Sequence, residues 1–157
     1  MTEPAATHWT PPACGFRVYE ATTVLGEGEE LWHRAAKDLL HWKVKTRSGF
    51  RVSSPGQVLA GERLRITVSV LGVTVVEPVE VVEVVHGPGQ VGFAYRTLPG
   101  HPVSGEEAFL VHRDGEKVLL TLRSLTRAAP QQPWRAMFPL LLVFQKVVRR
   151  RYRRALR

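Results

Sequence analysis

Short segments that alternate apolar and polar residues occupy the middle of the chain, and they constrain its fold more than any other feature. The clearest segment spans 62–70, where every second residue is apolar: Leu64, Ile66, Val68 and Val70. Successive side chains of a strand point to opposite faces of a sheet, so this period predicts a strand with one buried face. Similar segments follow at 79–85, 91–98, 108–112 and 117–125, separated by short turns. Such consecutive strands predict an antiparallel meander.

Pro78 is expected to begin the second of these strands, because proline has no N–H to donate to a ladder. Before the meander, 16–25 predicts a further strand, and 29–42 has helical spacing that ends at Trp42. Trp32 and Trp42 are expected to fill the core. The basic stretch 43–49 predicts a surface connection with solvated charges, and short strands are expected on either side of Pro55.

A second helix is predicted over 140–156, with Pro139 at its first turn. At 100° per residue it gathers Leu140, Leu141, Phe144, Val147, Val148, Tyr152, Ala155 and Leu156 on one broad face. The opposite face collects Lys146, Arg149, Arg150, Arg153 and Arg157. The whole pattern predicts an α+β fold, in which a curved antiparallel sheet grips this long C-terminal helix and a shorter helix follows the first strand.

The net charge of +8 is unevenly distributed. Residues 1–116 carry a net charge of −3, whereas 117–157 carry +11 and no acidic residue. The run at 149–154 predicts either a solvated face or weak electrostatic contact with nucleic acid or anionic lipid, through Arg149, Arg150, Arg153 and Arg154. Tyr152 is the one aromatic residue of the run, which argues against specific single-strand binding.

The ends of the chain and its cysteine content bear on domains and location. Residues 1–14 are rich in Pro, Thr and Ala and predict a flexible tail before a single domain at 15–157. Cys14 is the only cysteine, so it forms no internal disulfide, which fits a cytoplasmic location. No signal peptide and no apolar run long enough for a transmembrane helix is recognised.

The stretch 95–109 (YRTLPGHPVSGEEAF) is the one place where turn residues, a histidine and paired carboxylates meet. Neighbouring residues of a strand face opposite ways, so Glu106 and Glu107 are expected on different faces. That argues against joint chelation of a metal, and no metal or cofactor is predicted. His101 and one glutamate are left with three interpretations: a hydrogen-bonded tie that fixes the corner, a contact to a ligand, or an acid–base pair.

This stretch resembles the signature of an uncharacterised family of bacteria and plants, a domain of unknown function grouped with the START-like superfamily. The matching residues are Y-x-T-L-P-G-H-P-x-S-G-E-E-A-F over 95–109. Further matches lie at 24–28, at 78–82 and at 124–129, followed by Gln145, and together they cover most of 15–156. Ala128 departs from the pattern, which favours proline there. The resemblance implies a helix-grip fold and brings no established activity.

A helix lying across a curved sheet encloses either core or a cavity. The favoured function is therefore binding of an apolar or amphipathic small molecule between the sheet and the C-terminal helix. The candidate ligand-binding residues are Tyr95, Thr97, His101, Glu106, Glu107, Phe144 and Tyr152. Two alternatives remain: an interaction module that uses the basic helix, and a hydrolase or lyase that uses His101 and a glutamate. No common catalytic motif is present, so no catalytic residue is predicted.

Overall fold

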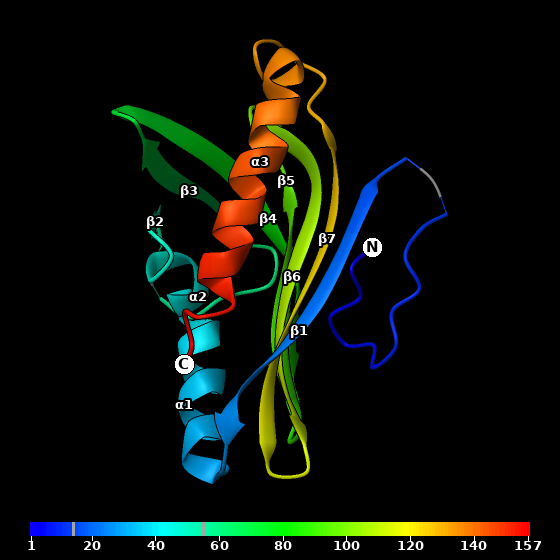
Figure 1. The fold of residues 1–157 in the computed structure, drawn as a ribbon, viewed down its shortest axis with the longest axis vertical. Coiled ribbons are helices and arrows are strands. Elements are labelled where there is room, and N and C mark those ends of the chain that lie inside the picture. The colour runs from blue at the N-terminus through cyan, green and yellow to red at the C-terminus, as the bar shows by residue number, and fades with distance from the viewer. Residues whose placement is uncertain (14, 55) are drawn as a thin grey trace.

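A seven-stranded antiparallel sheet curves around one long helix in the computed structural model of the protein, which describes residues 1–13, 15–54 and 56–157 (Figure 1). The strand order is β1-β7-β6-β5-β4-β3-β2. The strands are β1 Arg17–Glu27, β2 Phe50–Val52, β3 Arg63–Val70, β4 Val73–His86, β5 Gln90–Thr97, β6 Val103–Asp114 and β7 Lys117–Ala128. The helices are α1 Glu29–Leu40, α2 Lys43–Thr46 and α3 Trp134–Tyr152. The predicted α+β fold is confirmed, while Cys14 and Pro55 lie outside the described residues. Of the two short strands predicted around Pro55, the first is confirmed as β2. The second, at 57–59, is wrong, because the N–H of Val58 donates to the carbonyl oxygen of Leu40 at the end of α1 instead of to a strand.

Strand β6 begins five residues earlier than the sequence predicted, so it includes the paired glutamates. Glu106 pairs with Arg96 of β5 and with Leu125 of β7. The early start depends on Gly105, because a Cβ there would lie only 1.8 Å from the Leu125 carbonyl oxygen. Glycine thus lets the two backbones approach closely enough to continue the ladder.

Pro78 lies inside β4, so the prediction that it begins a strand is wrong. Its carbonyl accepts a hydrogen bond from the N–H of Leu98, just beyond the last β4–β5 pair of Val79 with Thr97. The amide nitrogen of a strand residue faces the same side as its carbonyl. The missing N–H therefore faces the corner after β5, where no ladder needs it.

Helix α3 begins at Trp134 and contains Pro139, so the predicted start at Pro139 is also wrong. The side-chain oxygen of Gln132 accepts a hydrogen bond from the N–H of Ala136 (3.1 Å) and satisfies one free donor of the first turn. The N–H of Met137 also donates to the carbonyl oxygen of Pro133 (3.1 Å), so helical hydrogen bonds begin before Pro139. Only Val148 and Tyr152 of α3 are buried, whereas Trp32, Ala35, Leu39 and Leu40 of α1 all are.

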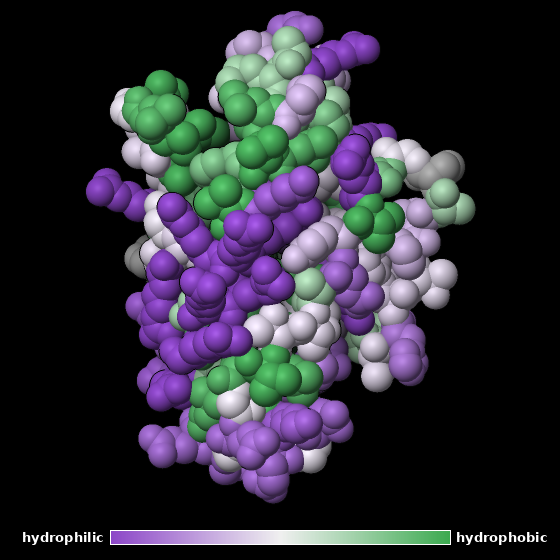
Figure 2. Space-filling view, in the orientation of Figure 1, coloured by the Kyte–Doolittle hydropathy of each residue, from purple (hydrophilic) through white to green (hydrophobic). Residues whose placement is uncertain are grey.

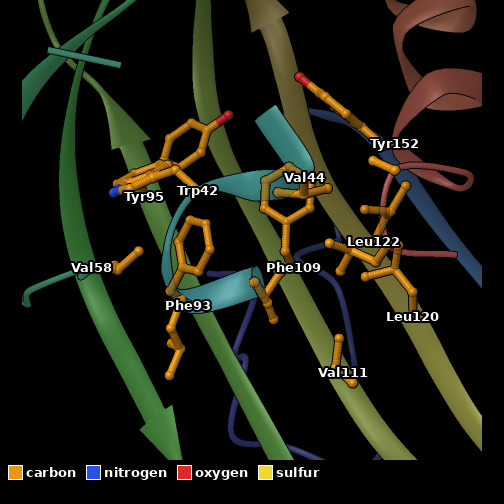
Figure 3. Close-up of a cluster of buried hydrophobic side chains, with 14 of the residues drawn as sticks. Trp42, Val44, Val58, Phe93, Tyr95, Phe109, Val111, Leu120, Leu122 and Tyr152 are labelled. Atoms are coloured by element: carbon orange, nitrogen blue, oxygen red, sulfur yellow. The ribbon is translucent and has the colours of Figure 1, made fainter. Parts of the chain in front are cut away.

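The main core fills the inner face of the sheet beneath α1 and α2. Phe93 and Phe109 point from neighbouring strands into one cluster with Trp42, and their ring centroids lie 5.6 Å apart (Figure 3). Both predicted core tryptophans, Trp32 and Trp42, are buried. Trp42 has a left-handed backbone (φ 61°) and turns the chain directly from α1 into α2. The stretch predicted to be a solvated connection therefore includes three buried residues, Val44, Lys45 and Ser48.

The N-terminal residues lie against the outer face of the sheet, on the side away from the helices (Figure 1). Thr2 is buried and donates its N–H to Glu106 Oε1 (2.6 Å). Arg123 Nη1 donates to the carbonyl oxygen of Glu3 (2.7 Å). The flexibility of 1–14 stays a prediction, but composition alone missed these contacts. Among the described residues, no helix is long and apolar enough to cross a membrane.

Candidate functional site

A cavity of about 620 Å³ lies between the inner face of the sheet and α3. Its walls come from β3–β7, from the corner that follows β5 and from α3, and most of the wall side chains are apolar. The exposed apolar residues of the lining come from the β3–β4 hairpin tip and the first half of α3, so we place the mouth of the cavity there. Both elements lie at the same end of the molecule (Figure 1). The space between sheet and helix is therefore hollow at this end and filled by core at the other.

All seven residues that the sequence nominated for ligand binding line this cavity: Tyr95, Thr97, His101, Glu106, Glu107, Phe144 and Tyr152. Five of them come from β5, β6 and the corner between these strands, and two come from α3. Figure 3 shows Tyr95 and Tyr152 with both hydroxyl groups at the end of the core cluster away from Val111. Their common location is a finding, and their contact with a ligand stays a prediction.

The paired glutamates face opposite sides of the sheet, as the sequence predicted. The Glu107 carboxylate points inward, where it accepts hydrogen bonds from Tyr95 and from Lys45. The Glu106 carboxylate instead accepts hydrogen bonds from the backbone N–H and the hydroxyl of Thr2. Glu107 is thus the glutamate that serves the cavity, and Glu106 holds the N-terminal segment.

Lys45 is the residue of the site that sequence reasoning missed. Its side chain is only 2% exposed, and its ammonium donates to Glu107 Oε2 (3.0 Å) and to the hydroxyl of Tyr152. Lys43, two residues earlier, is exposed. No local pattern distinguishes these two lysines, because the burial of Lys45 depends on the left-handed turn at Trp42. Glu107, a carboxylate on a core-facing strand position, was the one available hint of a buried cation.

Four aromatic rings surround the Lys45 ammonium. It lies 4.7 Å from the ring centroid of Tyr152, and 4.9, 5.0 and 5.4 Å from those of Phe50, Tyr95 and Phe109. Electron-rich ring faces attract a cation, and more strongly where water is excluded. The four aromatic rings and the Glu107 carboxylate together compensate for the free energy that is lost when the lysine is removed from water. This fixed polar cluster lies where the solid core meets the cavity.

Burial by itself raises the pKa of the Glu107 carboxyl, but the Lys45 ammonium and the hydrogen bonds from Tyr95 and Lys45 outweigh it and keep the pKa below its ordinary value. Burial raises the pKa of Tyr95 and of Tyr152 well above 10, and the nearby Glu107 carboxylate adds to this. At neutral pH Glu107 is therefore an ionised acceptor and both phenols are neutral. Three hydrogen bonds join these groups: Lys45 donates to Glu107 and to Tyr152, and Tyr95 donates to Glu107.

Glu77 differs from Glu107, although both line the same cavity. Burial raises the pKa of Glu77 to about 7, opposed by Lys45 and assisted by Glu107. Within the described part of the chain, no side chain forms a hydrogen bond or ion pair with its carboxyl group. Glu77 is thus a carboxyl group that faces the cavity and is close to half-ionised at neutral pH. It is the second functional candidate that the sequence interpretation missed.

His101 does not form the predicted tie to a glutamate. Its Nδ1 instead accepts a hydrogen bond from the N–H of Val103 (3.1 Å), and its carbonyl oxygen accepts one from Gln131 (3.1 Å). Burial, and next the positive charge of Lys45, lower the pKa of His101 to about 4. The imidazole is therefore neutral at pH 7 and carries its proton on Nε2, while its other nitrogen fixes the corner.

Arg149 also differs from its predicted position on the solvent face of the last helix. It is half-buried, donates to Ser124 Oγ (2.9 Å) and lies 3.9 Å from the ring centroid of Tyr19. Ser124 belongs to β7 and Tyr19 to β1, so Arg149 ties α3 to the edge of the sheet. Arg149 is therefore not one of the free cations that the sequence predicted on this helix.

Comparison with known proteins agrees with this geometry. Residues 1–155 match the family model described as Domain of unknown function (DUF1990). A UPF0548 protein of Arabidopsis thaliana is 31% identical over 107 residues, which are 64% of this chain and 52% of that protein. The chain thus spans about half the length of this relative.

Solved structures show the fold. A hypothetical protein of Helicobacter pylori superposes with a TM-score of 0.62 at 13% identity, covering 100% of this chain and 99% of that one. The aromatase/cyclase ZhuI of Streptomyces superposes with a TM-score of 0.51 at 21% identity, covering 90% and 92%. The predicted START-like helix-grip fold is confirmed. The chain belongs to the DUF1990 family.

Proposed function

We propose that this domain binds one amphipathic small molecule in the cavity between the sheet and α3. The cavity itself supports the proposal most strongly, because about 620 Å³ of apolar-lined space is the size of typical small-molecule sites. An interior that served only stability would be packed closely, as the other half of this sheet is.

The polar groups of the cavity suggest the chemistry of the ligand. Lys45, Glu107 and the two tyrosines are already joined to one another by hydrogen bonds, so they form a fixed polar boundary of the cavity. The Glu77 carboxyl is free to accept a hydrogen bond. A molecule with an apolar body and one hydroxyl or amine group fits this arrangement, with its donor directed to Glu77.

Catalysis by His101 and a glutamate is not part of the proposal. The His101 ring nitrogen that lacks a proton is occupied by Val103, and the inward glutamate by Lys45 and Tyr95. The likeness to an aromatase/cyclase is a likeness of fold at 21% identity. The cytoplasmic location also stays a prediction from the sequence.

Titration with Nile red, an uncharged apolar dye, tests the proposal. We expect saturable binding of one dye molecule, and its loss in Leu141→Trp, because Leu141 lines the cavity and an indole there would occupy space that the dye needs. Leu59→Trp is the matched control, since Leu59 is exposed and lies outside the cavity lining. Equal dye binding by Leu141→Trp and the unchanged protein would refute the proposed site.

A further inference from the structure

Exposed apolar side chains surround the mouth of the cavity. We name them the apolar cap: Leu71 (100% exposed), Leu140 (64%), Val73 (63%), Val143 (58%) and Met137 (37%). All five belong to the cavity lining, and they come from the β3–β4 hairpin tip and the first half of α3. Figure 2 shows hydrophobic residues gathered over this end of the molecule. The sequence predicted that Leu140 lies on the buried face of the helix, and its exposure shows that this prediction is wrong.

Leu71 has no local structural reason to be leucine. It and Gly72 form the two-residue turn between β3 and β4, with φ values of 50° and 79°. Positive φ at both positions is a type I′ turn, which favours asparagine or glycine. A leucine here has a strained backbone and a fully exposed side chain, which points to a partner that covers it.

Arginines gather on the same side of the molecule, at the other end of α3. Arg34, Arg47, Arg151, Arg154 and Arg157 surround a surface depression of about 550 Å³, which we name the arginine depression. Within the part of the chain that the structure describes, only Arg47 pairs with a carboxylate, that of Asp38 (2.8 Å). Five guanidinium groups with one counter-charge make this surface strongly attractive to anions.

The apolar cap and the arginine depression are joined by an exposed stripe along α3 that continues into the residues just after it. Leu140, Val143, Val147, Arg150 and Arg154 are all exposed and recur at three- or four-residue intervals. At 1.5 Å per residue, Leu140 and Arg151 are separated by about 16 Å along the helix. Figure 2 shows the hydrophilic band directly below the hydrophobic end.

We propose that this surface docks on anionic lipid membranes, with the apolar cap in the interface and the arginine depression at the headgroups. Apolar side chains of peripheral proteins enter roughly 5–10 Å, while basic residues a turn or more away stay beside phosphate and carboxylate groups. Nucleic acid would explain the arginines but leaves the apolar cap uncovered. Docking would place the cavity mouth against the bilayer, although the proposal does not require a bound ligand.

Vesicle flotation of the full chain at low salt tests this docking. We expect binding to vesicles of phosphatidylcholine with phosphatidylserine, and much weaker binding to phosphatidylcholine alone. Arg151→Gln combined with Arg154→Gln should weaken binding more than about tenfold, because each basic residue near such a surface contributes roughly fivefold. Arg51→Gln combined with Arg65→Gln removes the same charge from exposed positions on β2 and β3. This control pair should weaken vesicle binding much less than Arg151→Gln with Arg154→Gln.

The apolar contribution has its own variants. Leu71→Asn suits the turn, and with Leu140→Gln it should weaken vesicle binding about tenfold while the unfolding temperature is kept. The control is Leu59→Asn, at an exposed leucine outside the cap.

Three results would overturn the proposal. They are equal binding to neutral and anionic vesicles, no binding to either, and unchanged binding by the Leu71/Leu140 variant. Tighter binding to a DNA duplex than to anionic vesicles, at the same salt and insensitive to that variant, would assign the arginines to nucleic acid instead.

Discussion

The two ends of the sheet's inner face are both apolar, but only one is packed. Beneath α1 the side chains of Trp42, Phe93 and Phe109 are fully buried and in contact. Beneath the first half of α3 lies the cavity, and that half of the helix has no buried residue. The difference is therefore in how closely the helix approaches, and the caged Lys45 with Glu107 marks the boundary. An apolar sheet surface is therefore not sufficient to form a packed core.

The largest contrast is expected between two phenylalanines. Phe109→Ala in the packed end should lower the free energy of unfolding by about 3–5 kcal/mol, because it leaves a cavity in close-packed surroundings. Phe144→Ala on the cavity wall should cost less than about 1 kcal/mol, since it only enlarges an existing space. Urea unfolding measures both. Equal losses would mean that the two ends are packed alike.

Removal of the Lys45 ammonium should lower the free energy of unfolding nearly as much as Phe109→Ala does. Lys45→Met keeps the approximate length of the side chain but leaves Glu107 without its counter-charge, so we expect a loss of about 3 kcal/mol in urea unfolding. Lys43→Met, at the exposed neighbour, should change stability by less than about 0.5 kcal/mol.

A second substitution sharpens this test. Lys45→Met combined with Glu107→Gln should recover part of the loss, because the carboxylate no longer needs a partner. If the pair is no more stable than Lys45→Met alone, the unpaired charge is not the cause.

Glu77 should make stability depend on pH. Its pKa is raised from 4.5 to about 7 in the folded state, so folding binds a proton between these values and this contribution weakens stability as pH rises through them. Glu77→Gln should therefore stabilise the protein by about 1–3 kcal/mol at pH 8 and by almost nothing at pH 4.

The measurement is urea unfolding at both pH values, with Glu116→Gln at an exposed turn as the control. The depressed pKa of His101 acts with the opposite sign, because stability is lost as pH falls from 6.5 towards about 4. It is common to the variant and the parent, so their difference isolates Glu77. A gain that is the same at pH 4 and pH 8 would argue against a raised pKa.

The smallest change in the free energy of unfolding is expected when a larger side chain is placed in the cavity. Leu141→Trp adds volume to the cavity, so stability should change by less than about 1 kcal/mol. Ala35→Trp, which adds volume beneath α1 where Ala35 is fully buried, should cost at least about 1–3 kcal/mol. If Leu141→Trp is as damaging as Ala35→Trp, the space beneath α3 is not open.

The sequence predicted the parts of this architecture that follow from local periodicity. Alternation identified β3 and β5, and adjacency in β6 placed Glu106 and Glu107 on opposite faces. These predictions succeeded because a strand's period is a property of the backbone itself.

Apart from the early start of α3, the misses depend on contacts between distant segments. Lys45 is buried because the left-handed backbone of Trp42 turns α2 inward. Glu77 lines the cavity because α3 lies across this part of the sheet. Pro78 is tolerated inside β4 because its missing N–H faces the corner after β5, a segment distant in the sequence. Tertiary contacts of this kind leave no local periodic signal.

Native mass spectrometry of the protein purified from its native host shows whether the hollow end of the sheet holds a small molecule. We expect one added mass of a small molecule on the unchanged protein, and its absence from Leu141→Trp produced in the same host. An added mass on neither protein, or the same added mass on both, would contradict this expectation.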